Sequence, residues 1–345
     1  MVKKRQVELD LLRILALIAV IMVHCTGIRT NNDVSVVYNR IVTFILATIT
    51  WEVPVYVMIS GRFFLDPGRP VNSKKIKKSI FRLVIAFCFW DVIYQLYYIV
   101  SGNYSGLNWK GIVNEFITGP YHLWYLFMCI GLYAITPFLR IFMKEKRLME
   151  YFIILFFVGE TFNYYGIMIP GIGNAIAEVF EKTNFHFALG FSGYYILGYY
   201  LYHYDVPKKM EISLYTAGII CLIGTGGLTV LRSIVDGTGG EWYCKYLMPN
   251  VIVEAVAIYV FFVKRVSKIR FSNYAKSCIS KLSEYSFGVY LIHALVAELF
   301  IYTKIAVTCK NPLLMLLLIT VAVFIVSSVT VHLIRMIPYI GKKIT

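Results

Sequence analysis

The sequence predicts an all-α protein, a polytopic membrane helix bundle of about ten transmembrane helices. Apolar residues make up 59% of the 345 residues and the mean hydropathy is +0.68, so the chain is too hydrophobic for an ordinary soluble domain. Apolar stretches long enough to cross a bilayer recur along its whole length. With the N-terminus placed inside, 25 of the 34 Lys and Arg residues gather on the inner side. By the positive-inside rule, both termini are therefore expected in the cytoplasm.

Ten stretches are expected to span the membrane, and the loops between them are too short to fold as separate catalytic domains. Residues 1–345 are thus expected to form a single transmembrane domain in which the chemistry lies among the helices. No small-x-small cleavage site follows His24, so the first stretch is expected to remain as a helix and not to be removed as a signal peptide. In chain order the expected spans are 9–27, 41–61, 80–100, 123–139, 151–169, 186–202, 212–231, 248–263, 285–303 and 312–334.

The first stretch holds an ionised side chain and an imidazole. Ten uncharged residues separate Arg13 from His24, and eleven positions make three helical turns plus roughly 20°, so both side chains lie on one face about 16 Å apart along the axis. Asp10 precedes Arg13 by one turn and can pair with it. Such groups are costly in a membrane and usually functional. His24 is the first candidate for a general base, with Glu52 or Asp91 expected to orient its ring.

The later stretches carry ionisable groups at two depths. When the helices are taken in order with alternating direction, one set falls in the outer half or near the middle of the membrane, and a second set marks the inner half. A basic inner mouth suits an anionic ligand, whereas an outer half rich in His and carboxylates suits proton transfer. The outer and middle set is His24, Glu52, Asp91, His122, Glu160 and His293, and the inner set is Asp10, Arg13, Arg62, Arg82 and Arg335.

Several of these residues also allow a purely structural role. His122 and His293 could each hydrogen-bond to a neighbouring helix, and Glu160 could join two helices. Trp124 is as typical of a membrane interface as of a ligand wall. Both readings stay open at this point for all four residues.

The most basic segment lies between the second and third stretches. It runs from Arg62 through a Pro/Gly turn and a lysine run that includes Lys78, and it ends at Arg82. Two interpretations stay open, a charge cluster that sets topology or a cytoplasmic site for phosphates. The net charge of +15 follows the membrane sides, so nucleic acid is not expected as a partner. No CxxC or Cys/His cluster points to a metal.

Four motifs follow one another along nearly the whole chain. Arg13 precedes His24 with ten residues between them, and Pro54 precedes the pair Ser60-Gly61. The other two motifs are the segment His-Leu-Trp-Tyr-Leu at 122–126 and the segment Tyr-Ser-Phe-Gly-Val-Tyr-Leu-Ile-His at 285–293. They resemble, in order, the Arg-x10-His signature, the second-helix Pro…Ser-Gly motif, the fourth-helix segment and the Ser-Phe-Gly-x-Tyr-Leu-x-His stretch of the acyltransferase family 3 of integral membrane proteins.

The resemblance implies a ten-helix bundle in the bacterial cytoplasmic membrane, which transfers an acyl group, usually acetyl, from cytoplasmic acyl-CoA to a hydroxyl of an envelope glycan or related acceptor. The expected partners are membrane lipids, acetyl-CoA or another short acyl-CoA as donor, and that acceptor. The family's third-helix Arg-x-x-Arg motif is not intact in this chain, which has Lys78-Ser-Ile-Phe-Arg82 instead. Combined with the polar groups above, the expected sets are His24, Arg13 and Asp10 for catalysis, Glu52, Asp91, His122, Trp124, Tyr125, Glu160 and His293 for the acceptor pocket, and Lys78, Arg82, Arg62 and Ser60 for the donor.

Both the route and the function leave alternatives. His24 either deprotonates the acceptor hydroxyl or carries the acyl group itself. A transporter could use the same buried charges as an ion-coupled path, although no internal repeat is obvious in the sequence. The chain could also be the membrane domain of a larger racemase or sensor protein, because members of the family it resembles often carry an extra soluble domain.

Overall fold

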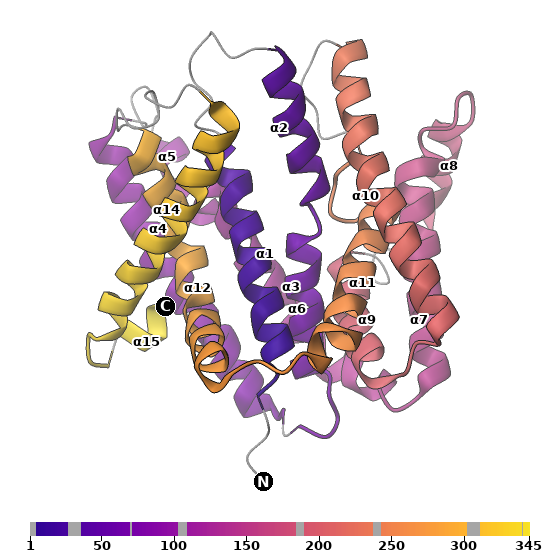
Figure 1. The fold of residues 1–345 in the computed structure, drawn as a ribbon, viewed down its shortest axis with the longest axis horizontal. Helices are drawn as coiled ribbons and strands as arrows, with labels where there is room; N and C mark the ends of the chain where they lie inside the picture. The colour runs from indigo at the N-terminus through magenta and orange to yellow at the C-terminus, as the bar shows by residue number, and fades with distance from the viewer. Residues whose placement is uncertain are drawn as a thin grey trace. The chain divides into compact units, whose positions relative to one another are not determined.

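Every regular element in the computed structural model is helical within the residues that it describes, as the sequence predicts (Figure 1). Those residues are 5–26, 36–69, 71–102, 109–183, 190–236, 243–301, 311–339 and 341–345. The elements are α1 (Val7–Cys25), α2 (Val36–Thr48), α3 (Glu52–Phe64), α4 (Ser73–Val100), α5 (Trp109–Thr118), η2 (Tyr121–Leu123), α6 (Trp124–Phe142), α7 (Lys146–Thr161), η3 (Phe162–Gly166), α8 (Gly173–Lys182), α9 (Phe191–His203), α10 (Lys208–Asp236), α11 (Pro249–Lys264), η5 (Val266–Lys268), α12 (Asn273–Ile301), α14 (Pro312–Arg335) and α15 (Gly341–Ile344).

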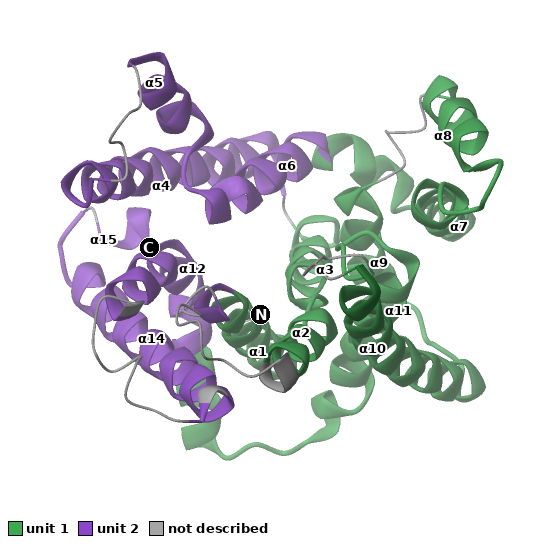
Figure 2. Cartoon of the chain, turned by 90° about the horizontal axis from the view of Figure 1, so that it is seen from above, with its two compact units in different colours: residues 1–23, 31–70, 136–280 green, residues 24–30, 71–135, 281–345 purple. Residues whose placement is uncertain are grey.

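The chain divides into two compact units, which Figure 2 colours separately. Unit 1 comprises residues 1–23, 31–70 and 136–280, and unit 2 comprises residues 24–30, 71–135 and 281–345. Helices α1, α6 and α12 each contribute residues to both units. Each unit therefore combines segments that lie far apart in the sequence.

Five helical stretches in the described part of the chain are long and apolar enough to cross a membrane, which confirms the membrane-helix character. A total of ten spans and the cytoplasmic position of the termini stay predictions. Helix α1 has a similar length but carries Glu8, Asp10 and Arg13 in its first half. The five stretches are Asn39–Phe64, Ser73–Val100, Trp109–Phe142, Lys208–Asp236 and Leu313–Arg335.

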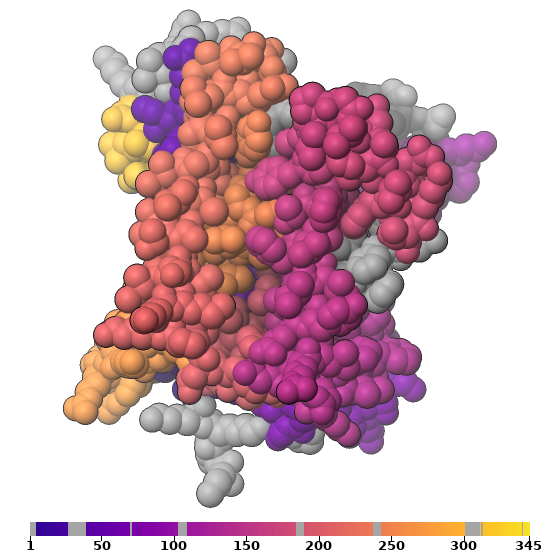
Figure 3. Space-filling view, turned by 90° about the vertical axis from the view of Figure 1, so that its right-hand side faces the viewer, coloured from indigo at the N-terminus to yellow at the C-terminus, as the bar shows by residue number. Residues whose placement is uncertain are grey.

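Helix α10 in unit 1 has an exposed apolar surface of the kind expected for a membrane-spanning helix. It is the long salmon helix on the face turned to the viewer in Figure 3. Its exposed apolar side chains recur along most of its length, and an exposed apolar surface of this extent marks contact with a membrane or a partner. The large ones are Met210, Ile212, Ile219, Ile220, Ile223, Leu228, Leu231, Ile234 and Val235.

The stretch expected at 41–61 is interrupted, because α2 ends at Thr48 and α3 begins at Glu52. In the turn between them the amide of Glu52 donates to the carbonyl of Ile49 at 3.3 Å. Pro54 explains the break, since proline has no N–H and its ring clashes with the carbonyl four residues earlier in a continuous helix. Glu52 thereby lies in the first turn of a new helix, and not in the interior of a long one.

Helices α3 and α9 pack backbone against backbone in unit 1. A Cβ atom added at Gly61 would lie 1.8 Å from the carbonyl oxygen of Tyr195, and one added at Gly198 would lie 1.9 Å from the carbonyl oxygen of Met58. Only glycine allows such an approach, a use of small residues that is typical of membrane helix pairs. Gly61 of the Ser-Gly motif therefore has a structural role, the close seating of α3 on α9.

Unit 2 is held together by side chains of α4 that reach the main chain of other helices. The hydroxyl of Tyr94 donates to the carbonyl of Leu291 at 3.0 Å and accepts from the amide of Leu295 at 3.0 Å, both on α12. The indole nitrogen of Trp90 donates to the carbonyl of Ile344 in α15 at 2.7 Å. These contacts fix α12 and α15 relative to α4 within this unit.

Candidate functional site

Three imidazole rings meet in unit 2. His24 comes from the end of α1, His122 from the short helix η2, and His293 from α12. Their ring centroids lie 5.0 Å apart for His24 and His293, 5.4 Å for His122 and His293, and 6.3 Å for His24 and His122. The side chains of His122 and His293 are buried, with exposed fractions of 2% and 0%. Three residues that the sequence singles out separately thus form one group, named the histidine cluster below.

The local sequence before α6 explains how His122 enters the cluster. Gly119 adopts a positive φ of 69°, a conformation that suits glycine, and Pro120 follows it. An added Cβ at Gly119 would also lie 2.6 Å from the ring of Phe87. The chain turns there into the single 3-10 turn Tyr121–Leu123, which buries the side chains of His122 and Leu123. The His-Leu-Trp-Tyr segment therefore forms the short 3-10 turn and the first residues of α6.

The hydrogen bonds of the histidine cluster define its chemistry. The Nδ1 atom of His293 lies 2.6 Å from the carbonyl oxygen of Tyr290, and a carbonyl only accepts, so Nδ1 carries the proton and Nε2 of the neutral ring carries a lone pair. Within the described ranges, Nε2 of His293 is buried without a hydrogen-bond partner. Buried polar atoms of this kind are rare in folded proteins and mark places where a substrate or an ordered water binds.

Aromatic rings surround the cluster. The ring of Tyr121 lies 5.3 Å from that of His24, and the ring of Tyr94 lies 4.9 Å from that of His122 in an edge-to-face arrangement. Tyr290 lies 5.8 Å from His293 between centroids. Tyr94, His122 and His293 are buried, and electrostatic interactions are stronger in such a low-dielectric setting.

Tyr125 and Trp124, the predicted pocket residues of α6, lie on the side of the cluster where Tyr290 packs. The ring centroid of Tyr125 is 5.5 Å from that of Tyr290, so Tyr125 contacts a residue that itself borders the cluster. Trp124 is 6.4 Å from Tyr125 between centroids and is 37% exposed. The acceptor-pocket assignment of both residues stays a prediction, and Tyr125 is the better placed of the two.

The sequence assigns Asp91 to the orientation of His24, whereas the hydrogen bond that the structure shows for this buried carboxylate comes from Gln95 Nε2 at 2.7 Å. The same amide nitrogen donates to the carbonyl of Glu115 at 3.0 Å, which links α4 to α5. Asp91 and Gln95 therefore act as a pair that supports the segment leading into η2.

The predicted pair of Asp10 and Arg13 is confirmed in unit 1. Arg13 Nη1 donates to Asp10 Oδ1 at 3.3 Å, and Arg5 Nε donates to Asp10 Oδ2 at 2.7 Å. The hydroxyl of Tyr56 on α3 donates to the carbonyl of Arg13 at 2.9 Å. These contacts anchor the first half of α1 on α3, so both charged residues have an evident structural role in this unit.

Arg62 at the end of α3 is buried and has a partner within unit 1. Its Nη1 atom donates to Asp66 at 2.9 Å, and its guanidinium lies 3.7 Å from the ring centroid of Tyr202. Burial acts to raise the pKa of Asp66, but the hydrogen bonds from Arg62 and the Gly68 amide and the nearby guanidinium charge outweigh it and lower that pKa below its ordinary value. The stabilisation by this ion pair is therefore present above the ordinary pKa of an aspartate and lost as the pH falls through the lowered one.

The same turn is clamped by a second arginine. Arg140 Nη1 donates to the carbonyls of Phe64 and Asp66, at 2.8 and 2.9 Å, and its Nη2 donates to the carbonyl of Arg69 at 3.1 Å. Arg62 and Arg140 thus both stabilise the loop that follows α3. This supports a structural role for Arg62 more directly than a role in phosphate binding.

The other predicted site residues fall into both units. In unit 1, Glu160 accepts from the amide of Gly190, which precedes α9, at 2.7 Å, and Glu52 accepts from the hydroxyl of Tyr246 at 3.2 Å. Ser60, half-buried on α3, belongs to this unit as well. Glu160 therefore joins two helix ends, the structural alternative that the sequence left open.

In unit 2, the donor-site candidates lie in the first turns of α4. Lys78 is exposed. Arg82 Nη2 donates to the main-chain oxygen of Thr345 at 2.7 Å, and its guanidinium lies 5.0 Å from the ring centroid of Phe287. The two residues are one helical turn apart and follow Lys74, Lys75 and Lys77, so this end of α4 is strongly basic.

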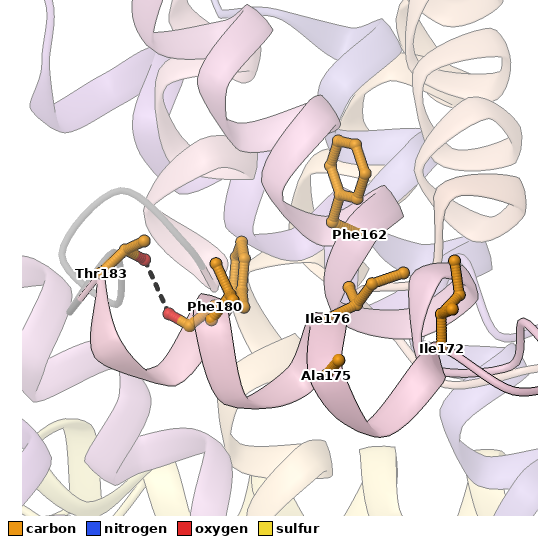
Figure 4. Close-up of a pocket in the computed structure, with 7 residues that line it drawn as sticks. Phe162, Ile172, Ala175, Ile176, Phe180 and Thr183 are labelled. Carbon is orange, nitrogen blue, oxygen red and sulfur yellow. Dashed lines mark hydrogen bonds between the residues drawn. The ribbon is translucent and has the colours of Figure 1, made fainter.

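An apolar pocket in unit 1 has ligand size but lacks reactive groups. Its volume is about 380 Å³. Phe162 of η3 and Ile176 and Phe180 of α8 are among the residues that line it, and the hydroxyl of Thr183 donates to the carbonyl of Phe180 at 2.6 Å (Figure 4). No titratable side chain lines it. We therefore place the candidate chemistry at the histidine cluster and not at this pocket.

The sequence did not single out Tyr94, Tyr121 or Tyr290, although each borders the cluster. Tyr290 lies three residues before His293 within one motif, and this spacing puts the two on one helix face. Tyr94 shares a face with Asp91 and Gln95 for the same reason. Within the described ranges, no set of three or more His, Cys, Asp or Glu side chains is arranged to hold a metal ion.

Comparison with known proteins gives a family match across both units. The family model described as an acyltransferase domain matches residues 6–332. An amino-acid racemase of Enterococcus faecalis is 23% identical over an alignment of 359 residues, which covers 99% of this chain and 48% of the racemase. The chain thus spans about half the length of that relative. No solved structure matches.

Proposed function

Because the chain belongs to the acyltransferase family 3 of integral membrane proteins, we propose that it is a membrane-bound O-acyltransferase of the bacterial cytoplasmic membrane. It transfers an acyl group, in the simplest case acetyl, from cytoplasmic acyl-CoA to a hydroxyl of an envelope glycan or related acceptor. The single observation that carries this proposal is the histidine cluster. It places the half-buried imidazole of His24 beside two buried imidazoles, and a ring positioned in this way is suited to exchanging a proton with a hydroxyl.

His24 is the reacting residue in either of two routes. As a general base, it removes the proton of the acceptor hydroxyl while the hydroxyl oxygen attacks the thioester carbon. As a nucleophile, its ring nitrogen attacks that carbon first and holds the acyl group until the acceptor takes it. Both routes need one nitrogen of His24 with a lone pair, so both depend on the tautomer of this ring.

The acyl-CoA donor is proposed to bind through its phosphates at the basic start of α4. Lys78 is exposed there and Arg82 lies one turn further. The sequence also named Ser60 and Arg62 for the donor, but these lie on α3 in unit 1, where Arg62 pairs with Asp66, so the donor proposal rests on the two α4 residues. Exposed basic side chains contact phosphates by charge-assisted hydrogen bonds.

Removal of charge at this site is expected to weaken donor binding. We expect a Lys78→Ala, Arg82→Ala double variant to bind acetyl-CoA about tenfold more weakly at low salt, with a smaller difference at high salt because salt screens exposed charges. Isothermal titration of acetyl-CoA onto the detergent-solubilised protein measures this. Lys78→Glu alone tests binding without loss of the bond between Arg82 and Thr345.

Lys110→Ala serves as the matched control, because Lys110 is exposed in the same unit but lies at the start of α5. Its acetyl-CoA affinity is expected to equal that of the wild type. Unchanged affinity of the double variant at both salt concentrations would refute the donor site and leave the proposed reaction standing.

The reaction itself is tested by incubating proteoliposomes with labelled acetyl-CoA and envelope material. We expect label to appear covalently in the glycan fraction. Movement of label across the membrane without covalent transfer would support a transporter instead. The Enterococcus faecalis relative favours one further alternative, a membrane domain of a larger amino-acid racemase, and transfer of acetyl by the present chain alone would show that it has its own activity.

A further inference from the structure

We infer that the imidazole of His293 orients His24, so that a second histidine and not a carboxylate sets the tautomer of the reacting ring. The inference rests on the proposed acyl transfer. The sequence offers Glu52 or Asp91 for this task, but the structure shows Asp91 accepting from Gln95 and Glu52 accepting from the hydroxyl of Tyr246. Within unit 2, the ring of His293 lies 5.0 Å from the ring of His24 between centroids.

This separation is the one that an imidazole pair needs. Two rings joined by an N–H···N hydrogen bond have centroids roughly 5 Å apart, because about 2.9 Å between the nitrogens adds to about 1.1 Å from each nitrogen to its centroid. His24 and His293 lie at that separation with an interplanar angle of 41°. The centroid distance of 6.3 Å between His24 and His122 exceeds it. Catalytic hydrogen bonds commonly tighten only when substrate binds, so we infer that rotation of the His24 ring completes the contact while His293 keeps its bond to the carbonyl of Tyr290.

The hydrogen-bond direction follows from the main chain. The carbonyl of Tyr290 holds the proton of His293 on Nδ1, so the neutral ring can only accept at Nε2, which is buried without a partner among the described residues. His24 must then donate its own N–H to His293 Nε2. The second nitrogen of His24 is left with a lone pair for the acceptor hydroxyl.

The reaction balances with this arrangement. The acceptor oxygen forms a bond to the acyl carbon, the carbon–sulfur bond of the thioester breaks, and the hydroxyl proton passes to His24 and from there to the CoA sulfur. His293 keeps its own proton throughout and stabilises the transient imidazolium by accepting its N–H. In the covalent route the same lone pair of His24 attacks the thioester, so the role of His293 is unchanged.

Tyr94 bonds to the main chain of α12 on both sides of His293 and so fixes the position of the turn that carries it. Its hydroxyl bridges the carbonyl of Leu291 and the amide of Leu295, each at 3.0 Å, and these are the two groups that an uninterrupted helix joins directly. A side chain inserted at such a point locally bends a helix. His293 lies between the two bridged residues, and the ring of Tyr94 also packs on that of His122. Tyr94 thus sets the turn that carries the orienting imidazole.

Two substitutions at one position separate the orienting role from a structural one. His293→Gln places an amide oxygen near the position of Nε2, where it can still accept from His24. His293→Asn keeps a donor for the carbonyl of Tyr290 but has no atom at Nε2. We expect the Asn variant to lower kcat on the order of 100-fold and the Gln variant to retain kcat within about tenfold of the wild type, with the KM for acetyl-CoA unchanged in both.

The opposite order would overturn the inference. If His293 serves only to bond the carbonyl of Tyr290, Asn retains kcat and Gln loses it. Equal loss in both variants with an intact fold also contradicts the role, and thermal melting in detergent shows whether each variant is folded. Absence of transfer by the wild type would instead count against the proposed function, so the two failures are distinguishable.

A tyrosine pair on unit 2 provides the second test. We expect Tyr94→Phe to lower kcat about tenfold at unchanged KM for acetyl-CoA, because the bridge at the turn of His293 is lost. Tyr285→Phe is the matched control, since the hydroxyl of Tyr285 also links α12 to a neighbouring helix, through His332 at 2.8 Å, but about two helical turns before His293. Equal effects of the two substitutions on kcat would refute the positioning role of Tyr94.

Discussion

His24→Ala is expected to abolish acyl transfer, with a loss of 10²-fold to 10⁴-fold or more, the usual contribution of a positioned acid–base group. The substitution removes the half-buried ring of the histidine cluster, the one that the proposed mechanism makes the reacting group. Transfer of labelled acetyl in proteoliposomes measures the loss. Wild-type transfer by this variant would show that the proposed mechanism is wrong.

His332→Ala is the matched control for this prediction. His332 is an exposed imidazole of α14 in the same unit, and its Nδ1 contacts the hydroxyl of Tyr285 and no member of the histidine cluster that the structure records. Its transfer rate is expected to stay near that of the wild type. Label retained on the wild-type protein without acceptor, and absent from His24→Ala, would select the covalent route over the general-base route.

Gly198→Ala is expected to destabilise unit 1 by about 3 kcal/mol, the upper end for overpacking. The added Cβ would lie 1.9 Å from the carbonyl oxygen of Met58 and 2.5 Å from its Cα, so helix α3 must move as a body because no flexible side chain can yield. A fall in the midpoint of thermal unfolding by several degrees, followed by tryptophan fluorescence in detergent, measures the loss.

Gly227→Ala is the control for the effect of the substitution itself. An added Cβ at Gly227 on α10 meets nothing within 4 Å, and alanine in a helix is more favourable than glycine by roughly 0.5–1 kcal/mol. We therefore expect the control to be as stable as the wild type or slightly more stable. If Gly198→Ala has the same midpoint of thermal unfolding as Gly227→Ala, the close contact of α3 and α9 does not contribute to stability as the structure indicates.

Several elements of this protein could be predicted from short stretches of sequence. Long apolar runs identified the membrane helices, and the spacing of Asp10 and Arg13 predicted an ion pair that the structure contains. Pro54 shows the limit of a hydropathy reading. The run around it is continuously apolar, but the proline separates α2 from α3 by local steric chemistry that hydropathy does not record.

The partners of buried polar residues could not be predicted in the same way. Glu160 bonds the amide of Gly190 and Asp91 bonds Gln95, although the pattern of charges favoured a shared pocket for both carboxylates. A helix sequence shows on which face a side chain lies but not which helix covers that face. For the same reason the role of Tyr94 could not be predicted, because it depends on two main-chain groups of α12.

The sequence by itself determined that the protein is an all-helical membrane protein of this acyltransferase family, and it singled out His24, His122 and His293 as separate candidates. These conclusions depend on hydropathy, spacing and motifs, which are local. Only the tertiary structure decided that the three imidazoles form one cluster, because contacts between residues so far apart in the chain arise from helix packing. The structure also decided the tautomer of His293, because the main-chain carbonyl of Tyr290 holds the proton of this ring on Nδ1.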